Sequence, residues 1–215
     1  MSELVPIPSP GVPFSYGEPG SALVVLVHDW FGRLPWLENY AKGLAHQGYR
    51  VVVPDLFDGV ATTDAATAEE LMNQLDVRTA LAALDDIIQV ARSEGSTRVG
   101  MVGFSLGGWL SLLHAQGGSA DAVVAYYATL GPDQHGVIPC PILLQFAEID
   151  EWDEGEDPES FISRLKDHGT PVTEFCYLGT VHSFANATIS DRVDVNAATL
   201  AFARTSSFLE GHLLT

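Results

Sequence analysis

Short apolar runs and amphipathic repeats alternate along the chain. Residues 22–27, 49–53, 99–104, 122–127, 142–146 and 172–177 read as strands, most of them buried on both faces. Between them, apolar positions recur every three or four residues. They predict helices over residues 35–47, 68–92, 106–115, 158–167 and 191–209. Residues 1–21 are rich in proline and glycine and predict an edge strand or an arm.

This alternation of strand and helix predicts the fold class. It is typical of an α/β protein with an open, mostly parallel sheet, helices on both faces and right-handed crossovers. The length of 215 residues suits a single domain over residues 1–215. Hydrophobic residues make up 47% of the chain and charged residues 18%, which is the composition of a globular protein.

The net charge of −18 narrows the class of partner. Nucleic acid and anionic membrane surfaces are bound through clustered lysine and arginine, and such a cluster is missing here. The N-terminal residues show no secretory signal, and the longest aliphatic run, residues 22–27, is too short to span a bilayer. We therefore expect a cytoplasmic protein. Cys140 and Cys176 fall in or beside predicted strands, where we expect buried free thiols, with a disulfide between them as the alternative.

A glycine-framed serine is the strongest motif in the chain. Gly103, Ser105 and Gly107 form the pattern G-x-S-x-G between the strand 99–104 and the helix 106–115. In this context the pattern predicts a nucleophile elbow, a tight turn that lifts the serine hydroxyl above the end of a strand. The alternative is an ordinary glycine-rich turn that cradles a phosphate, although neither a Walker motif nor G-x-G-x-x-G is present.

A nucleophilic serine needs a histidine base, which in turn needs an acid to orient it. On this type of sheet the three follow the chain order serine, acid, histidine. Asp150 lies in the acidic turn after the strand 142–146, and His182 lies in the loop after the strand 172–177. Both positions fall at the same sheet edge as the elbow. Asp153 is the alternative acid.

Two backbone amides are predicted to form an oxyanion hole: that of Leu106, directly after the nucleophile, and that of Trp30, in the loop after the first buried strand. Neighbouring side chains could bind substrate, although aromatic residues in such places are as often core. The predicted substrate-binding residues are Asp29, Phe31, Trp36 and Tyr127. Asp29 could instead bond to the serine region or to an arginine, or fix its own loop.

His28 and the rest of the acidic run around Asp150 and Asp153 are not expected to take part in catalysis. His28 is expected to be a packing or hydrogen-bonding residue. The acidic run over residues 148–157 is most simply a solvated loop, and a calcium site is the weaker alternative because the spacing departs from the EF-hand pattern. We expect no metal and no cofactor.

Together these motifs resemble the dienelactone hydrolase family of α/β-hydrolases, and the resemblance extends from about residue 20 to residue 210. It rests on the segments His28 to Gly32, Pro54 to Leu56, Gly103 to Gly108, Tyr126 to Tyr127, Ala147 to Asp150 and His182 to Phe184.

Three positions depart from what the resemblance implies. Family members that open dienelactones typically carry cysteine as the nucleophile and glutamate after the first core strand, where this chain has Ser105 and Asp29. They also bind the substrate carboxylate with arginines, one of them a few residues past the histidine, where this chain has Asn186. Arg33 and Arg78 are the remaining candidates for that role.

These patterns predict a serine hydrolase without metal or cofactor. It would cleave small neutral carboxylic esters or lactones through an acyl-serine intermediate, with Ser105, His182 and Asp150 as the triad. The alternatives are a thioesterase, a peptidase-like enzyme or a perhydrolase with the same triad, and a non-catalytic ligand-binding protein on the same fold.

Overall fold

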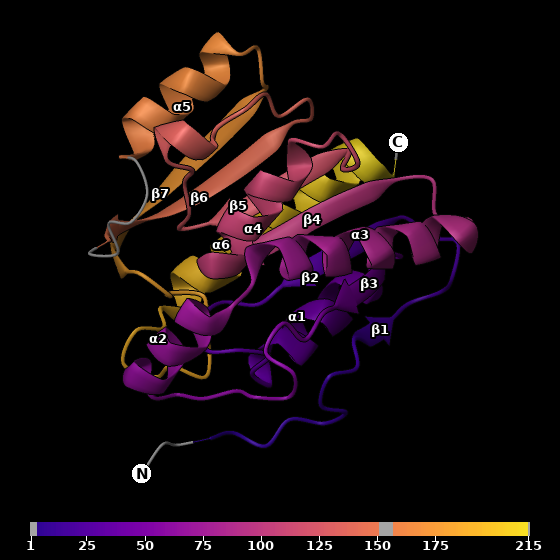
Figure 1. The fold of residues 1–215 in the computed structure, drawn as a ribbon. Coiled ribbons are helices and arrows are strands. Elements are labelled where there is room, and N and C mark those ends of the chain that lie inside the picture. The colour runs from indigo at the N-terminus through magenta and orange to yellow at the C-terminus, as the bar shows by residue number, and fades with distance from the viewer. Residues whose placement is uncertain (1–3, 151–156, 215) are drawn as a thin grey trace.

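The strands form one sheet at the centre of the molecule (Figure 1). The structure, a computed structural model, describes residues 4–150 and 157–214. The strand order is β1-β3-β2-β4-β5-β6-β7, and β1 alone pairs antiparallel with its neighbour. The strands are β1 (Phe14–Tyr16), β2 (Leu23–Val27), β3 (Arg50–Val53), β4 (Val99–Phe104), β5 (Ala122–Tyr126), β6 (Ile142–Ile149) and β7 (Val172–Val181).

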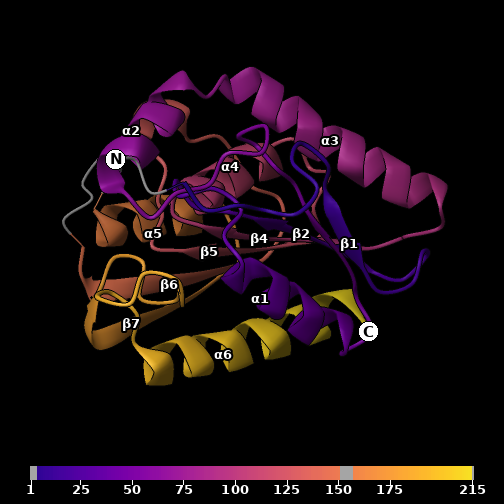
Figure 2. The ribbon, with the colours of Figure 1, turned by 90° about the horizontal axis from the view of Figure 1, so that it is seen from below.

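Helices cover both faces of this sheet (Figure 2). The helices are α1 (Trp36–Ala45), α2 (Ala65–Gln74), α3 (Val77–Ser93), α4 (Leu106–Ala115), α5 (Pro158–Asp167) and α6 (Val195–Leu213), with a 3₁₀ turn at Pro132–Gln134. One apolar core lies beneath α1 and α6, and a second lies beneath α3, α4 and α5. The predicted α/β class is confirmed. Within the described residues, no helix combines the length and apolarity needed to cross a bilayer.

The helix predicted over residues 68–92 is wrong, because the structure has two helices there. The backbone at Leu75 is extended, which ends the first helix. The carboxylate of Asp76 then accepts a hydrogen bond of 2.7 Å from the backbone amide of Thr79. A side chain that satisfies a free amide in this way starts a new helix. Asp194 caps α6 in the same manner through the amide of Ala197, so the last helix begins later than predicted.

The cysteine prediction holds in part. Both cysteines are free, and Cys140 is buried as expected. Cys176 is exposed, since it lies on β7, the strand at one edge of the sheet.

A chain of buried polar side chains joins α6 to the sheet. The hydroxyl of Thr205 on α6 lies 2.8 Å from the hydroxyl of Tyr126. It also accepts a hydrogen bond of 2.8 Å from the side-chain amide of Gln145. Tyr40 extends the chain to α1, and Tyr177 extends it to β7. Because buried polar groups must be paired, this network favours one placement of α6 on the sheet.

Arg33 holds the N-terminal arm against the rest of the molecule. Its side chain is 1% exposed and donates to the carbonyls of Val12 at 2.5 Å and Pro8 at 2.7 Å. The buried carboxylate of Asp55, in the loop after β3, lies 3.7 Å away. The arginine therefore joins the arm to this loop, and its guanidinium is committed to structural contacts.

We predict that Arg33→Met lowers the free energy of unfolding by about 3 kcal/mol, because it leaves Asp55 buried without a counter-charge. Urea denaturation measures this loss, and limited proteolysis should show faster cleavage within residues 8–14. Arg98→Met is the matched control. Its ion pair with Asp121 is exposed and should contribute less than about 1 kcal/mol. Equal stability of the two variants would contradict the prediction.

Candidate active site

Ser105 lies at a strained turn between β4 and α4. Its backbone has φ 51° and ψ −117°, which side-chain-bearing residues rarely adopt. The flanking glycines have no room for a side chain. A Cβ at Gly103 would lie 2.1 Å from the carbonyl oxygen of Gly107, and one at Gly107 would lie 2.4 Å from that of His28. The turn that the motif predicts is therefore present, and sterics explain its glycines.

Ser105, His182 and Asp150 come together at the carboxyl edge of the sheet. The Oγ of Ser105 lies 2.7 Å from Nε2 of His182. The other ring nitrogen, Nδ1, lies 2.8 Å and 2.9 Å from the two carboxylate oxygens of Asp150. Since an ionised carboxylate only accepts, a neutral His182 that bonds to it has its proton on Nδ1 and can accept from the serine at Nε2. Asp153, the alternative acid, lies outside the described residues.

A bulge in β7 sets the position of His182. Ala147 of β6 pairs with Tyr177, whereas Ile149 pairs with Val181, so β7 carries extra residues over this stretch. Gly179 adopts φ +76° within the bulge, and its amide donates to the Glu148 carboxylate at 2.6 Å. We predicted a loop directly after residue 177. That is wrong, because β7 continues through the bulge to Val181. A glycine inside a strand pattern is the signal that could have revealed it.

The two predicted oxyanion amides belong to neighbouring segments. Leu106 is the first residue of α4, so its amide has no acceptor within the helix and lies at the positive end of the helix dipole. Val27 pairs with Gly103, and the carbonyl of His28 is in contact range of Gly107. The loop that carries Trp30 thus follows a strand end packed against the start of α4.

The side chain of His28 forms hydrogen bonds within the loop that carries Trp30 and to the loop after β3, in agreement with the predicted hydrogen-bonding role. Its Nδ1 donates to the carbonyl of Asp29 at 2.7 Å, and its Nε2 accepts from the amide of Leu56 at 3.1 Å. One nitrogen donates and the other accepts, so the ring is neutral. Burial lowers its pKa and favours the same state.

Asp29 fixes its own loop, one of the three alternatives weighed for it. The side chain is fully buried. One carboxylate oxygen accepts from the amide of Phe31 at 3.0 Å, and the other accepts from Nδ2 of Asn186 at 2.8 Å. Burial raises the pKa of Asp29 to about 6. Its partner is thus an amide and not the arginine that was considered.

The predicted aromatic residues divide between the triad and the core. The ring of Tyr127 lies 4.8 Å from the ring of His182 and borders the triad. Trp36 packs edge-on against Phe104 at 4.7 Å, deeper in the core. Phe31 is 3% exposed. Substrate contact by these side chains, and by Asp29, stays a prediction.

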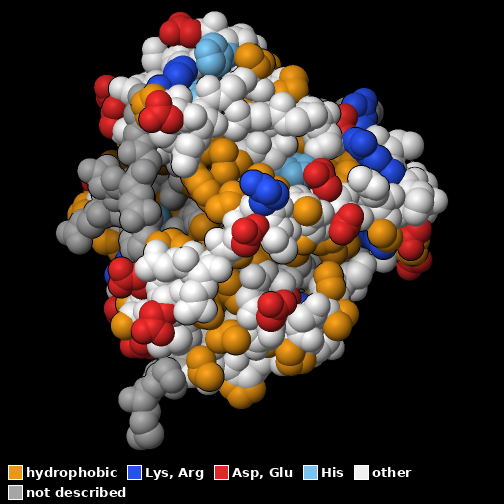
Figure 3. Space-filling view, viewed as in Figure 1, with side chains coloured by type: hydrophobic (Ala, Val, Ile, Leu, Met, Phe, Trp, Pro, Cys, Tyr) orange, Lys and Arg blue, Asp and Glu red, His pale blue; other side chains and the backbone are white. Residues whose placement is uncertain are grey.

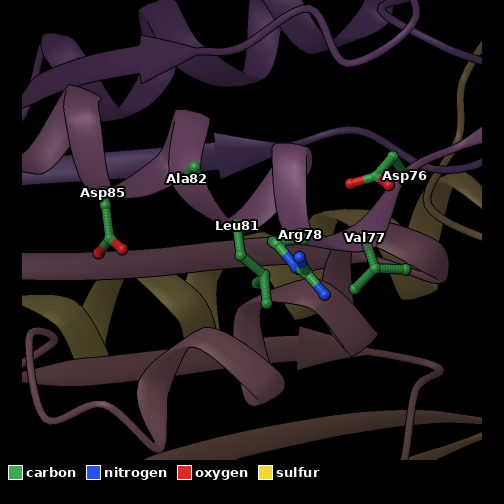
Figure 4. A pocket seen from close by; sticks show the side chains of 6 residues that line it. All are labelled: Asp76, Val77, Arg78, Leu81, Ala82 and Asp85. Atoms are coloured by element: carbon green, nitrogen blue, oxygen red, sulfur yellow. The ribbon is translucent and has the colours of Figure 1, made fainter.

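Arg78 lies on the outer surface of α3 and lines a hollow there together with Asp76 and Asp85. The hollow is also lined by Val77, Leu81 and Ala82 (Figure 4), and no triad residue is among its lining residues. On the face that Figure 3 shows, apolar side chains gather in a hollowed region, and both acidic and basic side chains lie around it. No group of three or more potential metal-ligating side chains occurs among the described residues.

The strand order and the sequence of serine, acid and histidine define the fold of an α/β-hydrolase. The sequence profile of the dienelactone hydrolase family matches residues 14–213, and the chain belongs to this family. The prediction of a hydrolase of the ester and lactone type is confirmed at this level.

The chain is also similar to curated relatives and, in its fold, to solved structures. A carboxymethylenebutenolidase from Rhodococcus opacus is 29% identical over 88% of this chain and 81% of its own. Protein usf from Aquifex pyrophilus is 27% identical over 92% of this chain and 90% of its own. A dienelactone hydrolase-like promiscuous phosphotriesterase from metagenomic libraries has the same fold, with a TM-score of 0.74 and 18% identity over 91% of this chain and 88% of that one.

The raised pKa of Asp29 predicts a pH-dependent stability. A folded-state pKa of about 6 exceeds the unfolded value, so the contribution of the carboxyl to stability is full at low pH and is lost as pH rises through 6. Asp29→Asn does not titrate. We expect the difference in free energy of unfolding, wild type minus variant, to fall by about 2 kcal/mol between pH 4 and pH 7. Urea denaturation at each pH tests this, and a pH-independent difference would count against it.

Proposed function

We propose that the protein is a serine hydrolase that cleaves small neutral carboxylic esters or lactones through an acyl-serine intermediate. The observation that carries the proposal is the continuous chain from Ser105 through His182 to Asp150, with contacts of 2.7 Å and 2.8 Å. Family membership supports the ester and lactone type. The serine nucleophile does not follow from family membership; it is inferred from Ser105 and its contact with His182.

In the acylation step, Oγ of Ser105 attacks the carbonyl carbon of the substrate while Nε2 of His182 takes its proton. The amides of Leu106 and Trp30 donate to the resulting oxyanion, and losing one such donor typically costs about 3 kcal/mol of transition-state stabilisation. His182 then protonates the alkoxide leaving group. In a lactone this alcohol stays attached to the acyl group.

Deacylation repeats these steps with water. His182 takes a proton from the water that attacks the acyl-serine, and it returns that proton to Ser105 as the acid is released. Asp150 holds the ring with Nδ1 protonated and stabilises the imidazolium that forms in both half-reactions. No step calls for a metal or cofactor.

The charges around the site favour neutral substrates. The position where the family resemblance implies a carboxylate-binding arginine holds Asn186, which is buried and bonded to Asp29. Arg33 is engaged by the N-terminal arm. A substrate carboxylate would instead approach acidic groups on a chain of net charge −18.

Thioesterase, peptidase-like and perhydrolase activities use the same triad, and a panel of ester, thioester and amide substrates with a peroxide assay separates them. Tight ligand binding without turnover would favour a non-catalytic protein.

We further propose a cytoplasmic location, which the two free cysteines support.

We predict that Ser105→Ala lowers kcat for p-nitrophenyl butyrate by about 10⁴-fold or more, since the nucleophile is gone. A fluorophosphonate should label the wild type at Ser105 and leave the variant unlabelled, as mass spectrometry of the tryptic peptides will show. Ser93→Ala, which removes an exposed hydroxyl at the end of α3, should keep full activity. Labelling elsewhere, or turnover by Ser105→Ala, would exclude this mechanism.

We also predict that the enzyme prefers neutral esters to anionic ones. At low ionic strength, kcat/KM for p-nitrophenyl butyrate should exceed that for mono-p-nitrophenyl succinate by about tenfold or more, because the succinate carboxylate meets like charge. The ratio should shrink as salt is added. A preference for the anionic ester would contradict the proposed substrate class.

A further inference from the structure

Two buried polar side chains join the loop that carries Trp30 to the loop that carries His182. Asp29 and Asn186 are both fully buried, and a single hydrogen bond of 2.8 Å connects them. Their separation along the chain is 157 residues, so this is a tertiary contact between the loops that follow β2 and β7.

Each side chain also fixes the backbone of its own loop. The second carboxylate oxygen of Asp29 accepts from the amide of Phe31, next to Trp30. The side-chain oxygen of Asn186 accepts from the amide of Thr188 at 3.0 Å, and its backbone amide donates to the carbonyl of Ser183, next to His182, at 2.9 Å. The polar side-chain atoms of the pair thus have defined partners on both loops.

We propose that Asp29 and Asn186 form a positioning latch that sets the distance between the oxyanion-binding amide of Trp30 and the imidazole of His182. This inference rests on the proposed function, since it concerns the geometry of that reaction. Neither residue touches the reacting atoms in the proposal, and both act through the loops that they hold. Misplacement of reacting groups by about 1 Å can cost 10²-fold in rate, so a loose latch should lower kcat.

The polarity of the latch makes it testable by exchange of the two residues. In Asp29→Asn, the new amide group meets the amide of Asn186, and two donors face each other. In Asn186→Asp, two carboxylates face each other. The double variant D29N/N186D restores a donor opposite an acceptor, with the donor now at position 29 and the acceptor at position 186. The remaining oxygens can still accept from the amides of Phe31 and Thr188.

The experiment measures kcat and KM for p-nitrophenyl butyrate, the rate of Ser105 labelling by a fluorophosphonate, and Tm. The proteins are the wild type, Asp29→Asn, Asn186→Asp and the double variant D29N/N186D. We expect each single variant to lose about 10- to 100-fold in kcat and in labelling rate, with a smaller change in KM. We expect the double variant to recover to within about threefold of the wild type.

Thr170→Val is the matched control. It removes a buried hydrogen bond from the Thr170 hydroxyl to the carbonyl of Ile138. Thr170 lies just before β7 begins, so this bond is at the amino-terminal ends of the strands, away from the triad. It should lower Tm and leave kcat unchanged. This comparison separates positioning from a general loss of stability.

Single variants that keep wild-type kcat would overturn the latch. So would a double variant that folds with wild-type Tm and yet stays more than about tenfold slow, and this second outcome can be read even if the single variants do not fold. Failure of the wild type itself to label at Ser105 would overturn the proposed function and the latch together. Normal labelling of the wild type with insensitive variants overturns the latch alone.

Discussion

The strained backbone at Ser105 is the constraint on which the site depends. Holding φ at 51° brings the start of α4 against β4 and β2 so closely that Gly103 and Gly107 have no room for a side chain. Such strain persists only where the surrounding structure over-determines it, and here β4 is central, with parallel partners on both sides. The apolar cores on the two faces therefore stabilise the position of one hydroxyl.

The loops around this hydroxyl are held by polar side chains, of which His28 and Asp29 are buried and Glu148 is exposed. His28 joins the loops after β2 and β3, and Asp29 joins the loop after β2 to that after β7. Glu148 holds the bulge of β7 against β6. In each case a side-chain acceptor satisfies an N–H group of another segment, which a loop at a crowded sheet edge requires. These contacts hold segments that are far apart in the sequence beside one another.

The charge distribution around the site differs from what a carboxylate-binding hydrolase needs. Where the family resemblance implies an arginine, this chain has Asn186, so the buried carboxylate of Asp29 has an uncharged amide as its side-chain partner. Burial accordingly raises its pKa to about 6. Arg33 contacts the N-terminal arm and Asp55. The features that the family resemblance marks as departures, at residues 29 and 186, are thus in direct contact, and they support the proposal of a neutral substrate.

Local patterns in the sequence determined the fold class and the elbow, because apolar runs, helical repeats and G-x-S-x-G each reflect contacts between residues close along the chain. The order of serine, acid and histidine on a parallel sheet also predicted which side chains would meet. Only the tertiary structure decided where the long helical repeat breaks at Asp76, how β7 passes the irregularity that Gly179 signals, and that Asp29 bonds to Asn186. A break, a bulge and a long-range pair depend on which hydrogen bonds the neighbouring segments leave to be made, and a single strand or helix pattern carries no record of those neighbours.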